Sequence, residues 1–385
     1  MPPITAPSTT VRQLPVLGPD GNWMLSVLAK RTYRLLDSGR CVLAEEQLPL
    51  QEEPVTDPAA PELMLADIDL YPYKPATDVV VRGQGRSASP TRQLEVSVEV
   101  GRVRKTLLVL GERRAAFSAT GRLFFSDPTL FQELPLRYDH AYGGSDALAE
   151  AKYGIPAEPF KDWLPKHLNV KDLSPYRYPR NPCGKGYVID ATPEAIETLE
   201  LPRIEDPADR LTPERLALGR PGAWPRMPLP ASFDWLNLGW FPRVAYLGVL
   251  PDFDPVEGPI AEVARGFAPP DVLKDGLVQD KFNLRLTNGA SLGLQLPYLR
   301  GDENCRLHNI HPKELSFAFR LPGERPRIWT DGRKGKLNET QPVIHTVLIE
   351  PDEQRLTILW RGAAPALRPY LPQELEKMPL RVEWP

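Results

Sequence analysis

The residues of this chain that could do chemistry are scattered, and a cysteine that follows a histidine-containing motif is the first candidate. Cys183 lies in the segment NPCGKG, and Asp139 and His140 precede it in YDHAYGG, another glycine-rich motif. A Cys–His pair suits acyl transfer because the histidine can take the proton of the thiol. Cys183 stands between Pro182 and Gly184, however, with no local signature of a cysteine hydrolase. We therefore favour a small residue in a tight turn.

The same NPCGKG segment has a superficial likeness to a phosphate-binding loop. Such a loop needs an earlier glycine at a fixed spacing and a Ser or Thr directly after the lysine. Here Arg180 and Asn181 precede the segment's Gly184-Lys185 pair, and Gly186 follows it, so the likeness fails on both sides. We predict instead that Asn181 makes side-chain-to-backbone turn bonds, for which asparagine is well suited.

A metal site is the next candidate, because Cys305, His308 and His311 fall at i, i+3 and i+6 and all three residue types bind zinc. In a strand, residues i and i+3 face opposite sides of the sheet, and Pro312 disfavours a helix through this segment. A structural zinc site also needs a fourth ligand, which the sequence does not indicate. We predict ordinary loop histidines and no metal.

Two acidic pairs, Asp252 with Asp254 and Glu205 with Asp206, have the residue types of glycosidase carboxylates. That chemistry needs the carboxylates on either side of a sugar at a defined separation, which spacing along the chain does not establish. We therefore predict no catalytic residue and no cofactor. A hydrolase that acts through Cys183 or a carboxylate pair remains the alternative.

The composition describes a folded chain without a nucleic-acid surface. Proline and glycine, 45 and 27 of 385 residues, make up roughly a fifth of the chain, below the share of disordered sequence. Basic residues number 47 and acidic residues 50, without a long basic run, which argues against nucleic acid. The three cysteines are odd in number and far apart, which fits a reducing compartment. With no leader-like start and no long apolar run, we expect a soluble cytoplasmic protein without membrane insertion.

The elements that must position these residues are mostly strands. Residues 94–100 alternate apolar and polar side chains, which predicts a half-buried strand. Residues 23–36 and 41–50 flank the turn-like residues 37–39 and predict a hairpin. Further strands are expected at 78–83, 106–110, 116–125, 284–286, 292–296, 315–321 and 328–329. The clearest hairpin joins residues 343–350 to 355–362 through the turn PDEQ.

The periodicity fades between residues 138 and 241, where Pro, Gly, Trp and Arg dominate. Two short helices are predicted there, near 145–152 and from 192–199, the second with Thr192 as its cap and Pro193 at its first position. We therefore predict a mainly β fold, with antiparallel sheets packed as a sandwich-like body, an irregular central region and a few short helices. Its expected parts are an N-terminal extension (1–22), a single domain (23–362) made of a β-rich lobe (about 23–137), the irregular region (about 138–241) and a second β-rich lobe (about 242–362), and a C-terminal tail (363–385).

Several charged residues lie within or beside the apolar β segments, where buried ion pairs are the expected use. Lys74 and Asp78, which flank a proline turn, are the predicted partners. Together with aromatic, asparagine and glycine positions, these residues form a set that we expect to be structural. The set is Lys30, Lys74, Asp78, Arg113, Tyr142, Gly143, Gly144, Asn181, Gly184, Gly186, Trp360 and Arg361.

The ordered motifs carry a resemblance to a known family. They are KRTY, KPATDVVVRG, GERR, YDHAYGG, NPCGKGY, LPRIE, the segment around Trp224 and VLIEPDEQRLTILWRG. In this order, over about residues 23–362, they resemble a bacterial domain-of-unknown-function family that accompanies type VI secretion loci. The resemblance implies a cytoplasmic adaptor or effector chaperone whose partners are a toxin effector and the spike with its PAAR cap. It brings no catalytic motif, and a structural component of the secretion apparatus is a further alternative.

Overall fold

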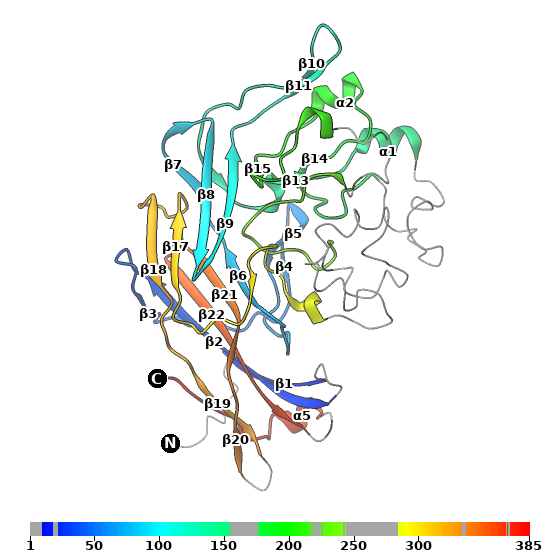
Figure 1. Ribbon diagram of the computed structural model, residues 1–385. Helices are drawn as coiled ribbons and strands as arrows, with labels where there is room; N and C mark the ends of the chain where they lie inside the picture. The colour runs from blue at the N-terminus through cyan, green and yellow to red at the C-terminus, as the bar shows by residue number, and fades with distance from the viewer. Residues whose placement is uncertain are drawn as a thin grey trace.

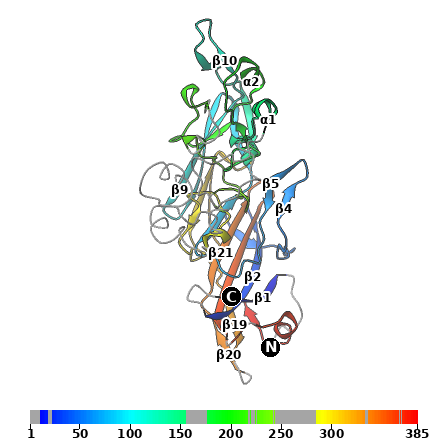
Figure 2. The ribbon, with the colours of Figure 1, turned by 90° about the vertical axis from the view of Figure 1, so that its right-hand side faces the viewer.

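The protein folds mainly as β-sheet, which confirms the predicted fold class. The computed structural model in Figure 1 describes residues 10–17, 22–154, 176–216, 219, 224, 226–241, 243, 284–332, 336–366, 368 and 370–385. Most of the long strands belong to two sheets at the centre of the molecule, as Figure 1 shows, and the turned view in Figure 2 shows a tall, narrow body.

The larger sheet has seven strands and combines strands from the N-terminal and C-terminal parts of the described chain. Its hydrogen-bonded order is β1-β2-β22-β21-β6-β16, and β3 pairs with β2. The bounds are Val11–Leu17 (β1), Trp23–Leu35 (β2), Cys41–Leu43 (β3), Thr77–Val81 (β6), Gln295–Leu296 (β16), Val343–Glu350 (β21) and Arg355–Pro365 (β22). The predicted hairpins β2–β3 and β21–β22 are confirmed, although β3 ends at Leu43 and not at residue 50. Strand β21 also pairs in parallel with β6.

The second sheet has five antiparallel strands in the order β15-β9-β8-β17-β18. The bounds are Gln93–Val100 (β8), Val103–Leu110 (β9), Ile204–Glu205 (β15), Asn304–His308 (β17) and Ser316–Arg320 (β18). The alternation predicted for residues 94–100 is confirmed in part. Val96 and Val98 are buried and Glu95 is exposed, whereas Ser97, expected on the wet face, is buried as well.

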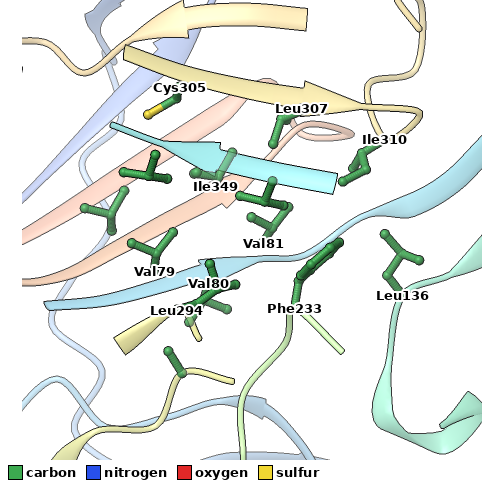
Figure 3. Packing of buried hydrophobic residues seen from close by; sticks show 14 of the residues in the cluster. Val79, Val80, Val81, Leu136, Phe233, Leu294, Cys305, Leu307, Ile310 and Ile349 are labelled. Atoms are coloured by element: carbon green, nitrogen blue, oxygen red, sulfur yellow. The ribbon is translucent and has the colours of Figure 1, made fainter. Parts of the chain in front are cut away.

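The main hydrophobic core takes side chains from both sheets. In β6, Val79, Val80 and Val81 are all fully buried, as a continuous apolar run covered on both faces should be. Figure 3 shows this strand and Ile349 of β21 beside Leu307 of β17. Burying one aliphatic side chain of this kind stabilises the fold by about 1.5–3 kcal/mol. The core therefore joins the N-terminal and C-terminal strands in one body.

Smaller sheets extend the body at both ends (Figure 1). Their strands are Val55–Asp57 (β4), Ala60–Ala66 (β5), Gln84–Thr91 (β7), Ala115–Phe117 (β10), Leu123–Phe125 (β11), Phe131–Pro135 (β12), Tyr142–Gly143 (β13), Lys185–Gly186 (β14), Arg327–Asp331 (β19), Leu337–Glu339 (β20) and Arg381–Glu383 (β23). They pair as β4–β5, β7–β12, β10–β11, β13–β14 and β20-β19-β23. The predicted strands near 116–125, 315–321 and 328–329 thus correspond to the β10–β11 hairpin, β18 and β19.

The described α-helices are short: Ala147–Tyr153 (α1), Pro193–Thr198 (α2) and Pro372–Leu375 (α5). The first two fall where the sequence predicts helices. Thr192 caps α2 as predicted, because its hydroxyl accepts a hydrogen bond from Ala195 N at 3.2 Å. Asp146 caps α1 in the same way. None of the helices in the part of the chain that the structure describes is long and apolar enough to span a bilayer.

One strand prediction is wrong. Residues 284–286 belong to a 3₁₀ turn, Leu284–Thr287 (η5), in which the Thr287 hydroxyl donates to Leu284 O at 2.6 Å. Leu286 of this turn is buried in an apolar cluster with Tyr178 and Trp224, so the apolar residues there reflect the burial of a turn. Of residues 292–296, only Gln295–Leu296 (β16) pair as a strand.

The turn between β2 and β3 yields a test of how this hairpin docks on the second sheet. Gly39 has φ +77°, and a Cβ there would lie 2.3 Å from Ala318 O of β18. Gly121, in the β10–β11 turn, has the same φ but nothing within 4 Å. Gly121→Ala should cost about 1–2 kcal/mol for the left-handed backbone alone. Gly39→Ala should cost about 1–3 kcal/mol more because the added methyl group overpacks against β18.

Chemical denaturation of the two variants beside the wild-type protein measures this difference. Equal losses in the free energy of unfolding would contradict the close contact between the β2–β3 turn and β18.

Candidate functional site

The predicted Lys74–Asp78 partnership is present at the start of β6. Lys74 Nζ lies 2.7 Å from Asp78 Oδ2, and the two side chains are 1 % and 0 % exposed. Lys74 Nζ also donates to Thr346 Oγ1 of β21 at 3.3 Å. The ammonium group lies 5.4 Å and 5.5 Å from the ring centroids of Tyr71 and Trp235, within the range of cation–π attraction. The partners of this one cation therefore come from several segments that are distant in the sequence.

Asp78 holds the segment that follows η5. Its Oδ1 accepts hydrogen bonds from Asn288 Nδ2 at 3.0 Å and Ala290 N at 3.2 Å, and its Oδ2 accepts from Gly289 N at 3.0 Å. With the lysine, the carboxylate has four donors, which satisfies a buried charge within the protein. The pair thus ties β6, β21 and residues 288–290 together.

His345 lies beside this pair and is a residue that sequence reasoning missed. It occupies the register shift between Ile344 and Thr346 of β21, and its Nε2 accepts a hydrogen bond from Lys74 N at 3.2 Å. Burial, and then the positive charge of Lys74, hold the pKa of His345 well below its ordinary value. The imidazole is neutral and fully buried, so it serves the framework as a hydrogen-bond acceptor.

The remaining predicted residues of the larger sheet have different surroundings. Lys30 Nζ lies 2.6 Å from Asp69 Oδ2, with side chains 11 % and 12 % exposed. Trp360 of β22 is buried in the main core. Arg361 follows it and so points to the opposite face of the sheet, where its Nε donates to Ser26 Oγ at 2.9 Å. All of these side chains are positioned by the long β2–β22 ladder.

Arg113 forms the other buried ion pair among the predicted residues. Its Nη2 lies 2.7 Å from Glu205 Oε1 and 2.8 Å from Pro202 O. Glu205 Oε2 accepts a further bond from Arg210 Nε at 2.9 Å. Both oxygens of the Glu205 carboxylate are thus engaged by arginines, and it does not face Asp206 across a substrate space. Asp206 Oδ1 accepts from Ala208 N, which closes a local turn.

The two glycine-rich motifs cross at the parallel β13–β14 pair, near α1 and α2 in Figure 1. Asn181 Nδ2 donates to the carbonyl oxygens of Tyr138 at 2.8 Å and Tyr142 at 3.0 Å. The Asn181 carbonyl accepts from Gly144 N at 2.8 Å and Gly184 N at 3.3 Å. The prediction that Asn181 makes side-chain-to-backbone bonds is therefore confirmed, and the residue joins both motifs.

The backbones at this crossing approach too closely for a side chain on Gly143. A Cβ there would lie 2.0 Å from Asn181 O. Gly143 pairs with Gly186 across β13–β14, and Tyr187 N donates to Gly143 O at 2.9 Å. The aromatic ring of Tyr142 is buried beside the crossing, with its centroid 5.0 Å from that of Tyr178. The glycines are thus required by the packing of one backbone on another.

A pocket of about 350 Å³ opens beside the crossing. Residues that line it include Gly143, Gly144, Asp146, Leu148, Lys185 and Leu199. The Asp146 carboxylate is used within the protein, because it accepts from the amides of Ala149 and Ile189, both at 2.9 Å. Lys185 Nζ lies 2.6 Å from Glu200 Oε2. The Asp146 carboxylate is therefore bonded to backbone amides, while Lys185 and Glu200, which both line the pocket, are paired with each other.

Cys183 lies at the same crossing and keeps its proton. Its Sγ donates to Asn181 Oδ1 at 3.2 Å. Burial, and then the negative charge of Asp139, raise the pKa of the Cys183 thiol to about 12. Burial also lowers the pKa of His140. No hydrogen bond joins Cys183 to His140, both of which the structure describes, so the pairing that acyl transfer requires is not formed.

The three zinc-type residues also point in different directions. Cys305 faces the main core from β17, and His308 ends the same strand on its other side. The ring of His311 stacks on Phe317 with centroids 4.0 Å apart, and its Nδ1 accepts from backbone amides. Within the described ranges, no three His, Cys, Asp or Glu side chains gather as a metal site. Asp252 and Asp254 lie outside the described residues.

A further buried pair had no signal in the sequence. Arg243 Nη1 lies 2.9 Å from Asp67 Oδ2, with side chains 0 % and 2 % exposed. The same arginine donates to Leu236 O at 2.6 Å and Leu286 O at 3.0 Å. Its partners are spread over the chain, so only the folded structure brings them together.

Comparison with known proteins identifies the family. Over residues 20–361 the chain matches the family described as "Uncharacterized protein conserved in bacteria (DUF2169)". The match spans most of the chain, and the protein belongs to this family. The predicted membership of a bacterial domain-of-unknown-function family is thus confirmed. No curated protein and no solved structure matches the chain.

The Lys74–Asp78 pair makes a direct prediction about stability. Asp78→Asn keeps the shape of the side chain but leaves the buried Lys74 ammonium without its countercharge. Breaking a buried pair in this way costs about 3–5 kcal/mol, so the denaturation midpoint should fall markedly. Asp37→Asn is the matched control, because it removes one acid from the exposed pair with Lys313. Similar midpoints for both variants would contradict a structural role for Asp78.

The state of Cys183 can be tested by alkylation. With a pKa of about 12, only about one thiol in ten thousand is ionised at pH 8, and the thiolate is the reactive form. We expect iodoacetamide to label Cys183 far more slowly in the folded protein than in urea, as peptide mass spectrometry can follow. Rapid labelling of the folded protein would mean an activated thiol and would revive the hydrolase alternative.

Proposed function

We propose that this protein is an adaptor, or effector chaperone, of a type VI secretion system. It binds a cognate toxin effector and helps to load it onto the spike and its PAAR cap. The proposal starts from the ordered motif set between KRTY and LWRG, which resembles a family found at type VI secretion loci, and from the family match over residues 20–361.

The observation that carries the proposal is that the charged and polar side chains of the motifs are bonded within the protein. Lys74, Asp78 and Arg113, whose charges are suited to chemistry, are buried and bonded within the protein. Asn181 and the glycines around it fix a crossing of two backbones. Polar residues that are bonded within the protein in this way make the fold rigid. A protein that binds a toxin and presents it to another protein needs such a rigid fold.

One projecting element offers a surface of the right kind. The β10–β11 hairpin extends from the body in Figure 1 and Figure 2. It carries Phe117 and Phe124, which are 37 % and 43 % exposed. Aromatic side chains are enriched in protein–protein interfaces relative to other surfaces, so this hairpin supports a partner-binding role.

The physical effect of such an adaptor on its toxin follows from mass action. A protein that binds the folded toxin and not the unfolded one stabilises it by about 2.7 kcal/mol when free adaptor exceeds the dissociation constant a hundredfold. The toxin must be held in this state before it meets the spike tip. The adaptor would therefore act in the cytoplasm.

Deletion of the gene tests the proposal. We expect the level or solubility of one toxin encoded nearby to fall and its delivery to stop, while secretion of the tube protein of the apparatus continues. The wild-type gene supplied in trans should restore both the toxin and its delivery. Affinity purification after co-expression with neighbouring genes should recover the toxin and the PAAR protein.

Other outcomes would decide against the adaptor. Loss of tube secretion together with toxin delivery would indicate a structural component of the apparatus. Unchanged abundance and delivery of every nearby toxin would remove the adaptor function altogether.

A further inference from the structure

Four basic side chains lie within or against the segment of residues 67–78, and they differ in whether a carboxylate neutralises them. Lys30 lies 2.6 Å from Asp69, Lys74 lies 2.7 Å from Asp78, and Arg243 lies 2.9 Å from Asp67. The fourth cation is Arg361, whose contact with the segment is the carbonyl of Pro72 at 3.2 Å. Each of the first three has a carboxylate, whereas Arg361 has none among the described residues.

Arg361 is buried without its countercharge. The residue is 8 % exposed, and burial lowers the pKa of its guanidinium. Nε donates to Ser26 Oγ at 2.9 Å and to Pro72 O, while Nη2 is buried with no hydrogen-bond partner. A buried charge without a partner costs free energy, and the two neutral acceptors offset this only in part. The guanidinium therefore has a free bonding edge and an unmet charge.

Two tyrosines frame this guanidinium near the protein surface. The Arg361 guanidinium carbon lies 5.3 Å from the ring centroid of Tyr73. Tyr298, which interacts electrostatically with Arg361, is 37 % exposed and donates its hydroxyl to Lys74 O. Burial, and then the neighbouring Tyr73, raise the pKa of the Tyr298 phenol, so it is uncharged and supplies no countercharge. Tyr298, which is partly exposed, therefore links this guanidinium to the protein surface.

We propose that Arg361, framed by Tyr73 and Tyr298, receives an aspartate or glutamate side chain of the toxin effector. The identity of this partner rests on the proposed function. Arginine and tyrosine are the side chains that most often dominate binding energy at interfaces. A guanidinium whose Nε is already held presents its remaining N–H groups to one planar carboxylate. A phosphate is disfavoured, because Lys74, which shares the neighbour His345 with Arg361, is neutralised by Asp78.

The first experiment uses the free protein and sodium acetate as the probe. Sodium acetate should raise the melting temperature of the wild-type protein more than the same concentration of sodium chloride does. Arg361→Met should abolish the difference, and Arg327→Met, which changes an exposed arginine paired with Glu339, should keep it. A wild-type protein indifferent to acetate, or an acetate effect that persists in Arg361→Met, would overturn the proposal. So would a response to sodium phosphate alone.

The melting temperature of Arg361→Met without a probe is a second readout. Ser26 Oγ donates to Pro72 O at 2.6 Å, so neither group loses its last partner when the guanidinium is removed. We expect the melting temperature to stay the same or to rise, because an uncompensated charge has been removed. A decrease as large as that of Asp78→Asn would make Arg361 a structural residue and contradict the proposal.

The final experiment measures affinity for the co-purified toxin. Arg361→Met should weaken binding at least about thirtyfold, as expected when one partner of a buried charge pair is removed, and Tyr298→Ala should weaken it in the same direction. Unchanged affinity of both variants would exclude the toxin as the source of the carboxylate. If the wild-type protein binds no toxin, the proposed function fails, and the acetate titration alone decides whether Arg361 is a carboxylate site.

Discussion

The buried ion pair of Lys74 and Asp78 is the interaction on which the described structure most depends. A charge placed in the core costs free energy unless it is paired and hydrogen-bonded. Here the four donors to Asp78 come from Lys74 and residues 288–290, while the lysine reaches Thr346 of β21. The pair therefore fixes where segments from three parts of the chain meet, and β6 enters the core in one register.

The segment of residues 67–78 also pairs other buried or half-buried charges. Its acids neutralise Lys30 on β2 and Arg243 beyond the irregular region, and its Leu70 packs against the apolar cluster of Leu28, Leu50 and Leu359. The opposite face of the larger sheet is closed by the apolar core shared with the second sheet. The segment of residues 67–78 thus combines two kinds of contact: burial of apolar area is non-directional, whereas each ion pair specifies one partner. Specific polar contacts thus select one packing of a body that hydrophobic burial stabilises.

The glycine crossing plays a comparable part in the region without regular periodicity. Long strands are replaced there by a two-residue parallel pair, and Asn181 supplies the hydrogen bonds that a longer ladder would provide. Close approach of the backbones leaves no room for a side chain at Gly143. Asn181 and the glycines around it therefore hold this region together from the inside of the protein.

The sequence by itself determined the elements whose signals are local. Alternating side chains in 94–100 and 343–362 predicted β8 and the β21–β22 hairpin, and Thr192-Pro193 predicted the start of α2. Lys74 and Asp78 were predicted as partners because they flank a proline turn just before an apolar strand. The tertiary structure alone decided the remaining contacts. His345, Asn288 and the Arg243–Asp67 pair have no nearby partner in the sequence, and the apolar pattern of 284–286 was mistaken for a strand. Such contacts depend on which distant segments the core brings together, and no local spacing encodes that.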